Sequence, residues 1–558
     1  MLNCKEKFKV LNNFSFIFVL SATLSWNLSS QEATQKTSAA KTEYSELRQQ
    51  ALERHRAIIF NDDGDDVRAY PQDKLPFSID KFFELRIAKL KDSHVNTISY
   101  STGTFGLFMH STKVGESMSQ PHSTSKYINA TSEFIKLKTD PLKEVVKFAH
   151  ANGFEIWWSL RINDTHDFVH RPDKPWPYWL KLKEKHPEYL MGECGQQLPF
   201  GRWSAVNFEY PEIRELLVKY VSEVCENYDV DGVELDFFRH LYLFKKVVLG
   251  GQAGDLERAM LSETIQKIHD MTERVSIKKG RAVLLAVRVP DSIPYCKEIG
   301  IDLEHWMQKK IVDIIIAGGY FNLNAWDYMV NACRKYNVKI YAGLEEPRIR
   351  SYHSKEKEHE LLLRRTLLGY RARAAEAWAG GVGGIYIFNE ADLNKLRIKR
   401  YLCEIDSPEI LSTKNKLHFV SYLKASPGNY LKGGVQYRNL PLLTPVTPIT
   451  LSPQSTLSLP IYLGKINNDK MFGVMFFYSR NIVPSDLTVK INGEIIDFMT
   501  RDGDLTSYSV PAKLLKTGHN QVDLISNTSF TLLDLALLLV NDPKESDVEL
   551  LLKACGKL

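Results

Sequence analysis

The chain has 558 residues, of which 44% are hydrophobic and 25% are charged, and its formal net charge is +5. This length exceeds what one hydrophobic core usually supports, so we expect two globular units, one of them large. Lysines and arginines are scattered among acidic residues and form no basic stripe, which argues against nucleic acid as a partner. The mild positive balance would suit an anionic substrate, such as a sulfated or uronic polysaccharide.

The N-terminus has the pattern of an export signal. Lys5, Lys7 and Lys9 precede an apolar run from Phe14 to Leu24, which small and polar residues follow. We assign residues 1–30 as a secretory signal peptide and expect a secreted or periplasmic protein. Because the run is well short of the roughly 20 apolar residues that span a bilayer, we expect no stable membrane insertion after signal removal. The seven cysteines lack the CxxC spacing of zinc sites.

A polar extension over residues 31–54 leads into residues 55–425, where strand-like runs alternate with amphipathic segments. The eight strand-like runs are Ala57 to Phe60, Val95 to Tyr100, Glu155 to Leu160, Gly232 to Phe237, Ala282 to Val289, Val312 to Ala317, Lys339 to Leu344 and Gly384 to Phe388. Eight strand–helix repeats predict an α/β fold, a (β/α)8 TIM barrel. An open doubly wound sheet is the alternative, although no GxGxxG follows the first strand.

After about Leu402 the pattern changes to short alternating segments divided by Pro, Gly, Asn and Asp. The strand-like ones are Leu457 to Leu463, Met471 to Tyr478, Leu487 to Gly493 and Gln521 to Ser526. They predict a smaller all-β sandwich domain over residues 426–558. Because this stretch has few aromatic side chains to spare, we favour a bracing role over glycan binding.

The fourth strand carries the main candidate chemistry, because catalytic groups of TIM barrels project from the C-terminal strand ends. In DGVELDFFRH the apolar residues at alternate positions face the helices, which turns Glu234 and Asp236 into the barrel. Two carboxylates buried close together raise at least one pKa, as catalytic acids require. The alternative is that Glu234 is a structural partner of a barrel arginine such as Arg161 or Arg288.

Strands seven and eight end in further carboxylates. Strand parity turns Glu345 inward, facing strand four across the mouth, and Glu390 follows strand eight. Glycosidic hydrolysis needs paired acids, so we assign Asp236 as nucleophile or acid, Glu345 as its partner, and Glu234 and Glu390 as reserves. The alternatives are a loop salt bridge of Glu345 with Arg348 and a helix-cap or loop role for Glu390.

Polar residues beside aromatic ones at the same strand ends predict sugar binding. Strand three runs into WSLRINDTHD. The segment NDDGDD after strand one forms either a turn with a solvated acidic face or a site for sugar hydroxyls or a cation. The substrate-binding candidates are Asp62, Asp63, Trp158, Arg161, Asn163, Asp164, His166, Arg239, Tyr320 and Asn389.

Four segments at strands one, three, four and eight, RAIIFNDDGDD, WSLRINDTHD, DGVELDFFRH and AWAGGVGGIYIFNE, resemble the glycosyl hydrolase-like 10 family, which is found as secreted proteins in polysaccharide-degrading bacteria. The resemblance covers residues 55 to about 400. It implies a barrel fold, a carbohydrate substrate and no obligatory cofactor, and it assigns no acid, base or nucleophile. Strand four here offers Glu-Leu-Asp in place of the Asn-Glu of many barrel glycosidases, so an aspartate nucleophile stays open.

Three functions follow from these features. The first is a glycoside hydrolase that acts on a complex polysaccharide. Its partner would be an oligo- or polysaccharide substrate, and the enzyme would need no metal or other cofactor. The second is a non-catalytic carbohydrate-binding barrel, which salt-bridged carboxyls would favour. The third is a metal-dependent hydrolase, which a single well-placed histidine makes a poorer fit. Its ligands would be Asp62, Asp164, His166 or Asp167.

Overall fold

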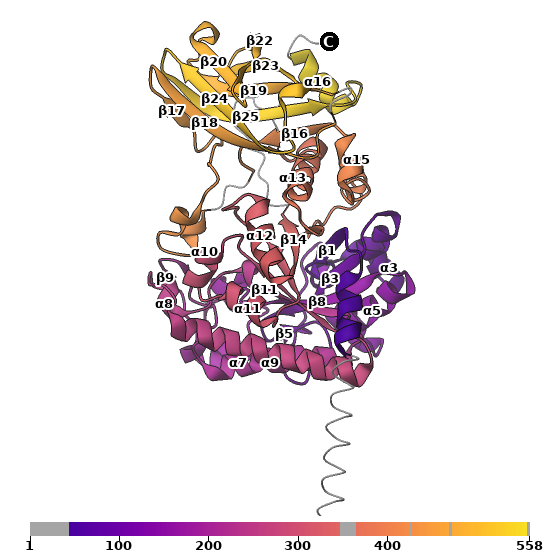
Figure 1. The fold of residues 1–558 in the computed structure, drawn as a ribbon. Helices are drawn as coiled ribbons and strands as arrows, with labels where there is room; N and C mark the ends of the chain where they lie inside the picture. Colours follow the sequence, from indigo (N-terminus) through magenta and orange to yellow (C-terminus); the bar gives the residue numbers. More distant parts are fainter. Residues whose placement is uncertain (1–43, 346–363, 423–425, 468–470, 555–558) are drawn as a thin grey trace, which may run out of the picture.

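The computed structural model describes residues 44–345, 364–422, 426–467 and 471–554, so the predicted signal peptide lies outside the described residues. Eight parallel strands close into a barrel in the order β1-β15-β14-β13-β12-β11-β8-β3 (Figure 1). Their bounds are β1 (Ile58–Asp62), β3 (Thr97–Ser101), β8 (Glu155–Arg161), β11 (Gly232–Asp236), β12 (Leu284–Val289), β13 (Ile314–Ala317), β14 (Lys339–Leu344) and β15 (Ile385–Ile387). Each overlaps one predicted strand, which confirms the (β/α)8 barrel and excludes the doubly wound sheet.

Helices and short strand pairs in the loops surround the barrel. The helices are α2 (Asp65–Arg68), α3 (Ile79–Leu85), α4 (Thr131–Lys136), α5 (Pro141–Ala151), α6 (Lys181–Lys185), α7 (Pro211–Asn227), α8 (Lys245–Val248), α9 (Asp255–Lys279), α10 (Ile293–Glu298), α11 (Leu303–Lys309), α12 (Trp326–Tyr336), α13 (Leu367–Gly380), α14 (Leu396–Leu402) and α15 (Pro408–Ser412). The loop strands are β2 (Tyr70–Pro71), β4 (Gly103–Thr104), β5 (Leu107–Phe108), β6 (Glu116–Ser117), β7 (Tyr127–Ile128), β9 (Gln197–Leu198) and β10 (Gly201–Arg202).

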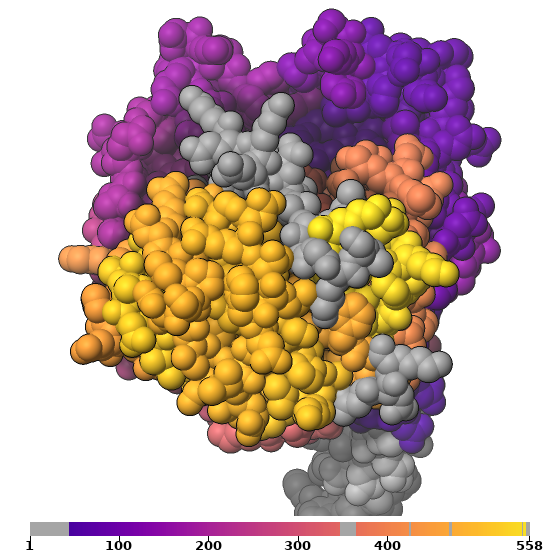
Figure 2. Space-filling view, turned by 90° about the horizontal axis from the view of Figure 1, so that it is seen from above, coloured from indigo at the N-terminus to yellow at the C-terminus, as the bar shows by residue number. Residues whose placement is uncertain are grey.

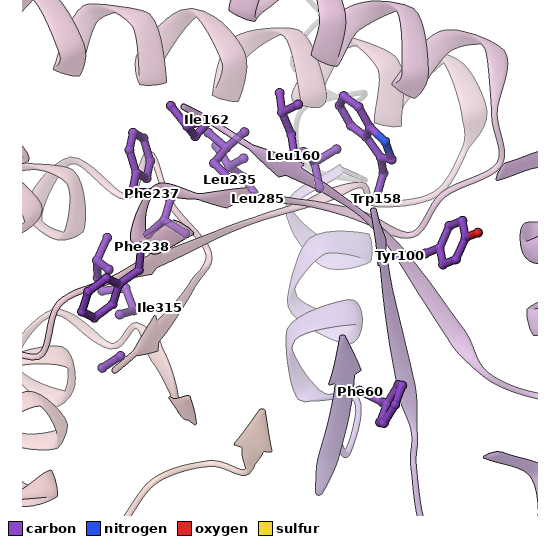
Figure 3. Close-up of a cluster of buried hydrophobic side chains, with 14 of the residues drawn as sticks. Phe60, Tyr100, Trp158, Leu160, Ile162, Leu235, Phe237, Phe238, Leu285 and Ile315 are labelled. Atoms are coloured by element: carbon purple, nitrogen blue, oxygen red, sulfur yellow. The ribbon is translucent and has the colours of Figure 1, made fainter. Parts of the chain in front are cut away.

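Alternate residues of the barrel strands fill two different cores. One set, which includes Trp158, Leu160 and Leu235, points toward the helices (Figure 3) and packs with their apolar faces. The other set, which includes Trp157 and Tyr386, fills the barrel interior. Residues 44–53 form a helix whose Ala51 and Leu52 pack against this inner cluster, so the polar extension ends in a helix that covers one end of the barrel.

The second domain consists of two antiparallel sheets, as a β-sandwich requires. One sheet has the order β16-β25-β19-β23-β22 with β17 paired to β25, and the other has the order β18-β24-β20-β21. The strands are β16 (Lys416–Phe419), β17 (Ile449–Leu451), β18 (Ser455–Leu463), β19 (Phe472–Arg480), β20 (Leu487–Ile491), β21 (Glu494–Ile495), β22 (Asp497–Asp502), β23 (Leu505–Pro511), β24 (Gly518–Ser526) and β25 (Phe530–Val540). Helix α16 (Ser546–Ala554) follows, and Val548 and Leu551 in it belong to an apolar cluster with residues of the first sheet.

The barrel and the sandwich meet along α13, which contacts β16, β18 and β24. Arg364 donates two hydrogen bonds to the Asp534 carboxylate, at 2.6 and 2.8 Å, and both side chains are buried. Strand β16 precedes residue 426, and the following segment 427–437 returns to the barrel, where the Tyr295 hydroxyl donates to the Pro427 carbonyl at 2.9 Å. Seen from the sandwich end, parts of the first half of the barrel project beyond the outline of the sandwich (Figure 2).

Two features bear on the environment of the protein. The cysteines within the described residues are free thiols, namely Cys194, Cys225, Cys296, Cys333 and Cys403. Among the described helices, none has the length and the apolar character that a membrane span requires.

Candidate active site

The β11 strand places Glu234 and Asp236 inside the barrel, as its alternation predicts. Val233 and Leu235 join the outer core, whereas Glu234 and Asp236 are 0% and 2% exposed without belonging to it. The strand register sets Asp236 level with Arg161 on β8 and with Arg288 on β12. One layer of the barrel therefore combines an acid with arginines on both neighbouring strands.

Arg288 joins the acids of two different strands. Its Nη1 donates to Asp236 Oδ1 at 2.7 Å, and its Nη2 donates to Glu345 Oε1. The guanidinium is fully buried and lies 4.4 Å from the ring centre of Phe388. Burial raises the pKa of Asp236 although Arg288 and Arg239 oppose the shift. The predicted partners Asp236 and Glu345 thus face each other across one cation.

Glu234 lies one layer deeper. Its carboxylate accepts hydrogen bonds from the Ser99 hydroxyl and, at 2.9 Å, from the Tyr386 hydroxyl. Burial and the neighbouring Asp236 charge raise its pKa to about 7. Arg288 donates hydrogen bonds to Asp236 and Glu345 and none to Glu234. The hydrogen bonds of Glu234 therefore do not support the alternative that it is a structural partner of a barrel arginine. Glu234 is therefore a buried acid that can hold a proton near neutral pH.

Two arginines and two aspartates form an ion-pair network at the mouth. Arg161 Nη1 lies 3.0 Å from Asp164 Oδ2, and Arg239 Nη2 lies 3.3 Å from Asp63 Oδ2. Asn389 donates to Asp63 at 3.1 Å. Burial opposes ionisation of both aspartates. Arg239 and Arg161 nevertheless hold the pKa of Asp63 below its usual value. The pKa of Asp164 is held well below its usual value, mainly by Arg161. Five of the predicted substrate-binding residues therefore meet in one charged network.

Aromatic rings extend this network outward. His240 stacks on Tyr242 with 5.7 Å between ring centres, and Tyr430 stacks on Tyr242 at 5.6 Å and on Tyr320 at 6.1 Å. The His166 side chain is 48% exposed, and its ring lies edge-on to that of His240. Such polar-tipped aromatic surfaces suit the alternating C–H and hydroxyl groups of sugars. The predicted residues His166 and Tyr320 thus lie at the mouth, beside tyrosines that no prediction included.

Two predicted residues face away from the mouth. Asp62 is the last residue of β1 and points outward, where it accepts a hydrogen bond from Arg86 at 2.8 Å. Trp158 packs in the outer core, and its indole N–H donates to the Thr102 hydroxyl at 2.8 Å (Figure 3). Both side chains are 0% exposed. A sugar in the mouth would meet neither of them, which corrects their assignment as binding residues.

Two others hold loops in place. The Asn163 side chain donates to the Val206 carbonyl at 2.8 Å and to the Tyr242 carbonyl, and it accepts from the Val206 N–H. Glu390 accepts from the backbone N–H of Asp392 at 3.2 Å, which is the loop role considered as its alternative. Neither makes a hydrogen bond to Asp236 or Glu345 in the described part of the chain, so the structure does not bring them into the carboxylate pair.

Among the candidate metal ligands, Asp164 and His166 contact each other, with 2.6 Å between Asp164 Oδ1 and His166 Nδ1, whereas Asp62 and Asp167 pair with other residues. Asp167 pairs with Lys183 at 2.5 Å, while Asp164 pairs with the mouth arginines. Within the described residues, the one group of three metal-ligating side chains lies on α9 and consists of His269, Asp270 and Glu273. The four predicted ligands therefore form no such group around the barrel mouth.

Some functional candidates were missed from sequence. Ser99 and Tyr386 take inward positions beside Glu234, and strand parity alone could have revealed them. Tyr242 follows β11 at the mouth. Tyr430 comes from the segment that returns from the sandwich, and no local pattern connects it to the barrel.

The sequence of this chain matches a family model. The Glycosyl hydrolase-like 10 family matches residues 73–250, which cover strands β3, β8 and β11 and the loops after them. The match bears out the resemblance to this family, and two of the four segments, WSLRINDTHD and DGVELDFFRH, lie within it. It supports glycoside hydrolase activity in general. A search of curated proteins found no match.

Solved glycosidase structures resemble the chain at low identity. The PgaB (BpsB) glycoside hydrolase domain from Bordetella bronchiseptica is 11% identical, with 63% of this chain and 99% of that chain covered and a TM-score of 0.38. A family 18 N-acetylglucosaminidase from Paenibacillus barengoltzii is also 11% identical, with 62% and 99% covered and a TM-score of 0.35. A cycloisomaltooligosaccharide glucanotransferase from Paenibacillus sp. is 9% identical, and this chain covers 57% of it, with a TM-score of 0.34. The fold assignment rests on the closed barrel itself.

Proposed function

We propose that the protein is a glycoside hydrolase that cleaves a complex, anionic polysaccharide with the carboxylates of Asp236 and Glu345. The observation that carries this proposal is the contact of both carboxylates with the single guanidinium of Arg288. Glycosidases need two acids on either side of the scissile bond. Here strands β11 and β14 bring two acids together at the inner mouth of a barrel, which is where such enzymes place their chemistry.

The environments of the two acids support a division of labour. The pKa of Asp236 is raised by burial, which suits the acid that protonates the leaving oxygen. Glu345, ion-paired with Arg288, would supply the carboxylate that attacks the anomeric carbon or activates water. Arg288 orients both groups. Glu234 lies one layer below Asp236, and with a pKa of about 7 it would be partly protonated there and so limit the negative charge beneath the pair.

The mouth residues would bind the substrate. Arg161 and Arg239 offer donors to sugar hydroxyls or acidic groups, and Asp63 and Asp164 offer acceptors. The tyrosines at the rim, including Tyr320, would stack on sugar rings. Because each of these arginines is paired with an aspartate, the support for an anionic glycan as the substrate class is the net charge of +5 of the whole chain.

A screen of the full chain on plant, marine and host polysaccharides tests the activity through release of reducing ends. We expect Asp236→Asn and Glu345→Gln to lower the rate about 10²- to 10⁴-fold while circular dichroism stays unchanged. Glu304→Gln, a carboxylate on the surface of α11, is the matched control and should retain activity. Full activity of Asp236→Asn on a substrate that the native chain cleaves would refute the assignment.

A second candidate is a carbohydrate-binding barrel without turnover. The specific observation in its favour is that Arg288 salt-bridges both carboxylates, which neutralises them when no substrate is bound. The two functions separate in the same screen. Binding of a glycan by calorimetry without any release of reducing ends, and without change in Asp236→Asn, would support this second function.

We further propose that the protein is exported. The support is the basic and apolar pattern at residues 1–30. Expression of the full chain followed by cell fractionation and N-terminal sequencing tests this. An intact Met1 on cytoplasmic protein would refute it.

A further inference from the structure

The long helix α9 carries a histidine whose ring is buried without a hydrogen-bond partner. His269 is 9% exposed, and neither Nδ1 nor Nε2 of its ring makes a hydrogen bond within the described part of the chain. Its Nδ1 lies 3.6 Å from Asp270 Oδ1, which is beyond hydrogen-bond distance. Buried polar groups of folded proteins nearly always have a partner, so an exception indicates a bound ion or water. His269 therefore marks a place where α9 can hold a ligand.

Two carboxylates stand beside this imidazole. Residues three and four apart on a helix are neighbours, so Glu273 lies next to both His269 and Asp270. One ligand atom from each of the three side chains lies within 4.8 Å of the other two. The Asp270 side chain is 49% exposed and Glu273 is partly exposed, whereas the imidazole is buried. A solute can therefore reach the group from solvent, and both carboxylates have room to move.

The two carboxylates are available to a cation. Among the described residues, neither forms an ion pair with a lysine or an arginine. The Arg48 guanidinium, whose charge also acts on Glu273, pairs with the Asp313 carboxylate at 2.5 Å. Asp270 Oδ1 accepts a hydrogen bond from the Gln266 amide at 2.7 Å, whereas its Oδ2 has no such donor in the described residues. With a neutral imidazole the group carries two negative charges, which match a divalent cation.

We propose that His269, Asp270 and Glu273 bind one divalent transition-metal ion, with Zn²⁺ as the best fit. An imidazole nitrogen together with carboxylate oxygens suits Zn²⁺, whereas Ca²⁺ and Mg²⁺ prefer oxygen ligands alone. Zinc bonds of about 2.0–2.2 Å place the ligand atoms of one tetrahedron about 3.4 Å apart, so a small movement of the two carboxylates closes the set. A water molecule would be the fourth ligand.

The role of this site is structural. Figure 1 shows α9 on the side of the barrel away from the sandwich. Glu273 acts electrostatically on Tyr44 and Arg48, which belong to the helix of residues 44–53. A metal ion on α9 would therefore fix this helix surface beside the start of the fold. It stabilises the folded chain without taking part in the chemistry of the mouth, so the proposal is independent of the proposed function.

Calorimetric titration of the metal-stripped full chain with Zn²⁺ tests the site. We expect a dissociation constant of about 10 µM or below for Zn²⁺, and binding of Ca²⁺ and Mg²⁺ that is at least about ten-fold weaker. Saturating Zn²⁺ should raise the Tm by about 2–5 °C, because an ion that binds the folded chain stabilises it by mass action. Differential scanning calorimetry measures this shift.

Two variants locate the binding. Glu273→Gln and Asp270→Asn each remove one ligand at a position that solvent reaches, so circular dichroism should show a native fold. Each should weaken Zn²⁺ binding about 10- to 100-fold and lose most of the Tm increase. Glu263→Gln, an exposed carboxylate on the same helix, is the matched control and should bind Zn²⁺ normally. The proposal is overturned if the native chain binds no Zn²⁺, if Ca²⁺ or Mg²⁺ binds equally tightly, or if both ligand variants bind Zn²⁺ like Glu263→Gln.

Discussion

Replacement of Arg288 by methionine would leave two buried carboxylates, Asp236 and Glu345, without their shared cation. Removing one partner of a buried ion pair destabilises a protein by about 3–5 kcal/mol. The variant can avoid part of this loss of stability by protonating a carboxylate. For a carboxyl with an unfolded pKa near 4, protonation costs about 4 kcal/mol at pH 7 and about 1.4 kcal/mol at pH 5. We therefore expect Arg288→Met to lose about 4 kcal/mol of unfolding free energy at pH 7.

The sign of the pH effect follows from proton binding. Burial raises the folded pKa of Asp236 even beside Arg288, and loss of this cation would raise it further above the unfolded value, so the folded variant binds more protons and stability falls as pH rises above about 4. Urea unfolding at pH 5 and pH 7, followed by tryptophan fluorescence, measures the difference. Arg56→Met is a matched control, because Arg56 holds a single buried carboxylate, that of Glu155. A loss below about 1 kcal/mol at pH 7, or a loss equal at both pH values, would refute this reasoning.

The remaining predictions concern the domain contact and the mouth. Arg364→Met should lower unfolding stability by about 3–5 kcal/mol by removing the buried cation that is paired with Asp534, and limited proteolysis should then separate the domains sooner. Tyr430→Ala should raise KM several-fold with kcat unchanged, as steady-state kinetics on a cleaved glycan would reveal. Asp164, whose pKa is held well below its usual value mainly by Arg161, stabilises the fold above its unfolded pKa near 4. That stability is lost in acid, so Asp164→Asn should flatten acid denaturation below pH 4.

Periodicity alone was enough to predict the barrel. The eight strands are short apolar runs separated by amphipathic segments, and each overlaps a predicted strand because burial on both faces leaves little choice of residue. The same alternation placed Glu234 and Asp236 inside the barrel. Features that follow the two-residue repeat of a strand, such as which side chains face the barrel interior, can therefore be predicted from the sequence.

The errors arose where that alternation was not applied. Trp158 follows Trp157 on β8, and neighbours on a strand face opposite sides, so one of them had to lie in the outer core. Strand β1 extends to Asp62, so the neighbours Asp62 and Asp63 likewise point to opposite sides of the barrel wall. Contacts made by Tyr430 were beyond any such rule, because they depend on how a distant segment returns to the barrel.

The barrel interior has a composition that stability alone does not explain. TIM barrels are filled mainly with branched apolar residues, whereas here Ser99 and Glu234 form one layer and Asp236, Arg288 and Glu345 form the next. Apolar side chains of similar volume would fold at least as well as a buried ion triad. We therefore infer that the charges are kept for what they do to a ligand. Their position at the inner mouth, beneath a rim of arginines and tyrosines, is the position that the proposed hydrolysis of a glycan requires.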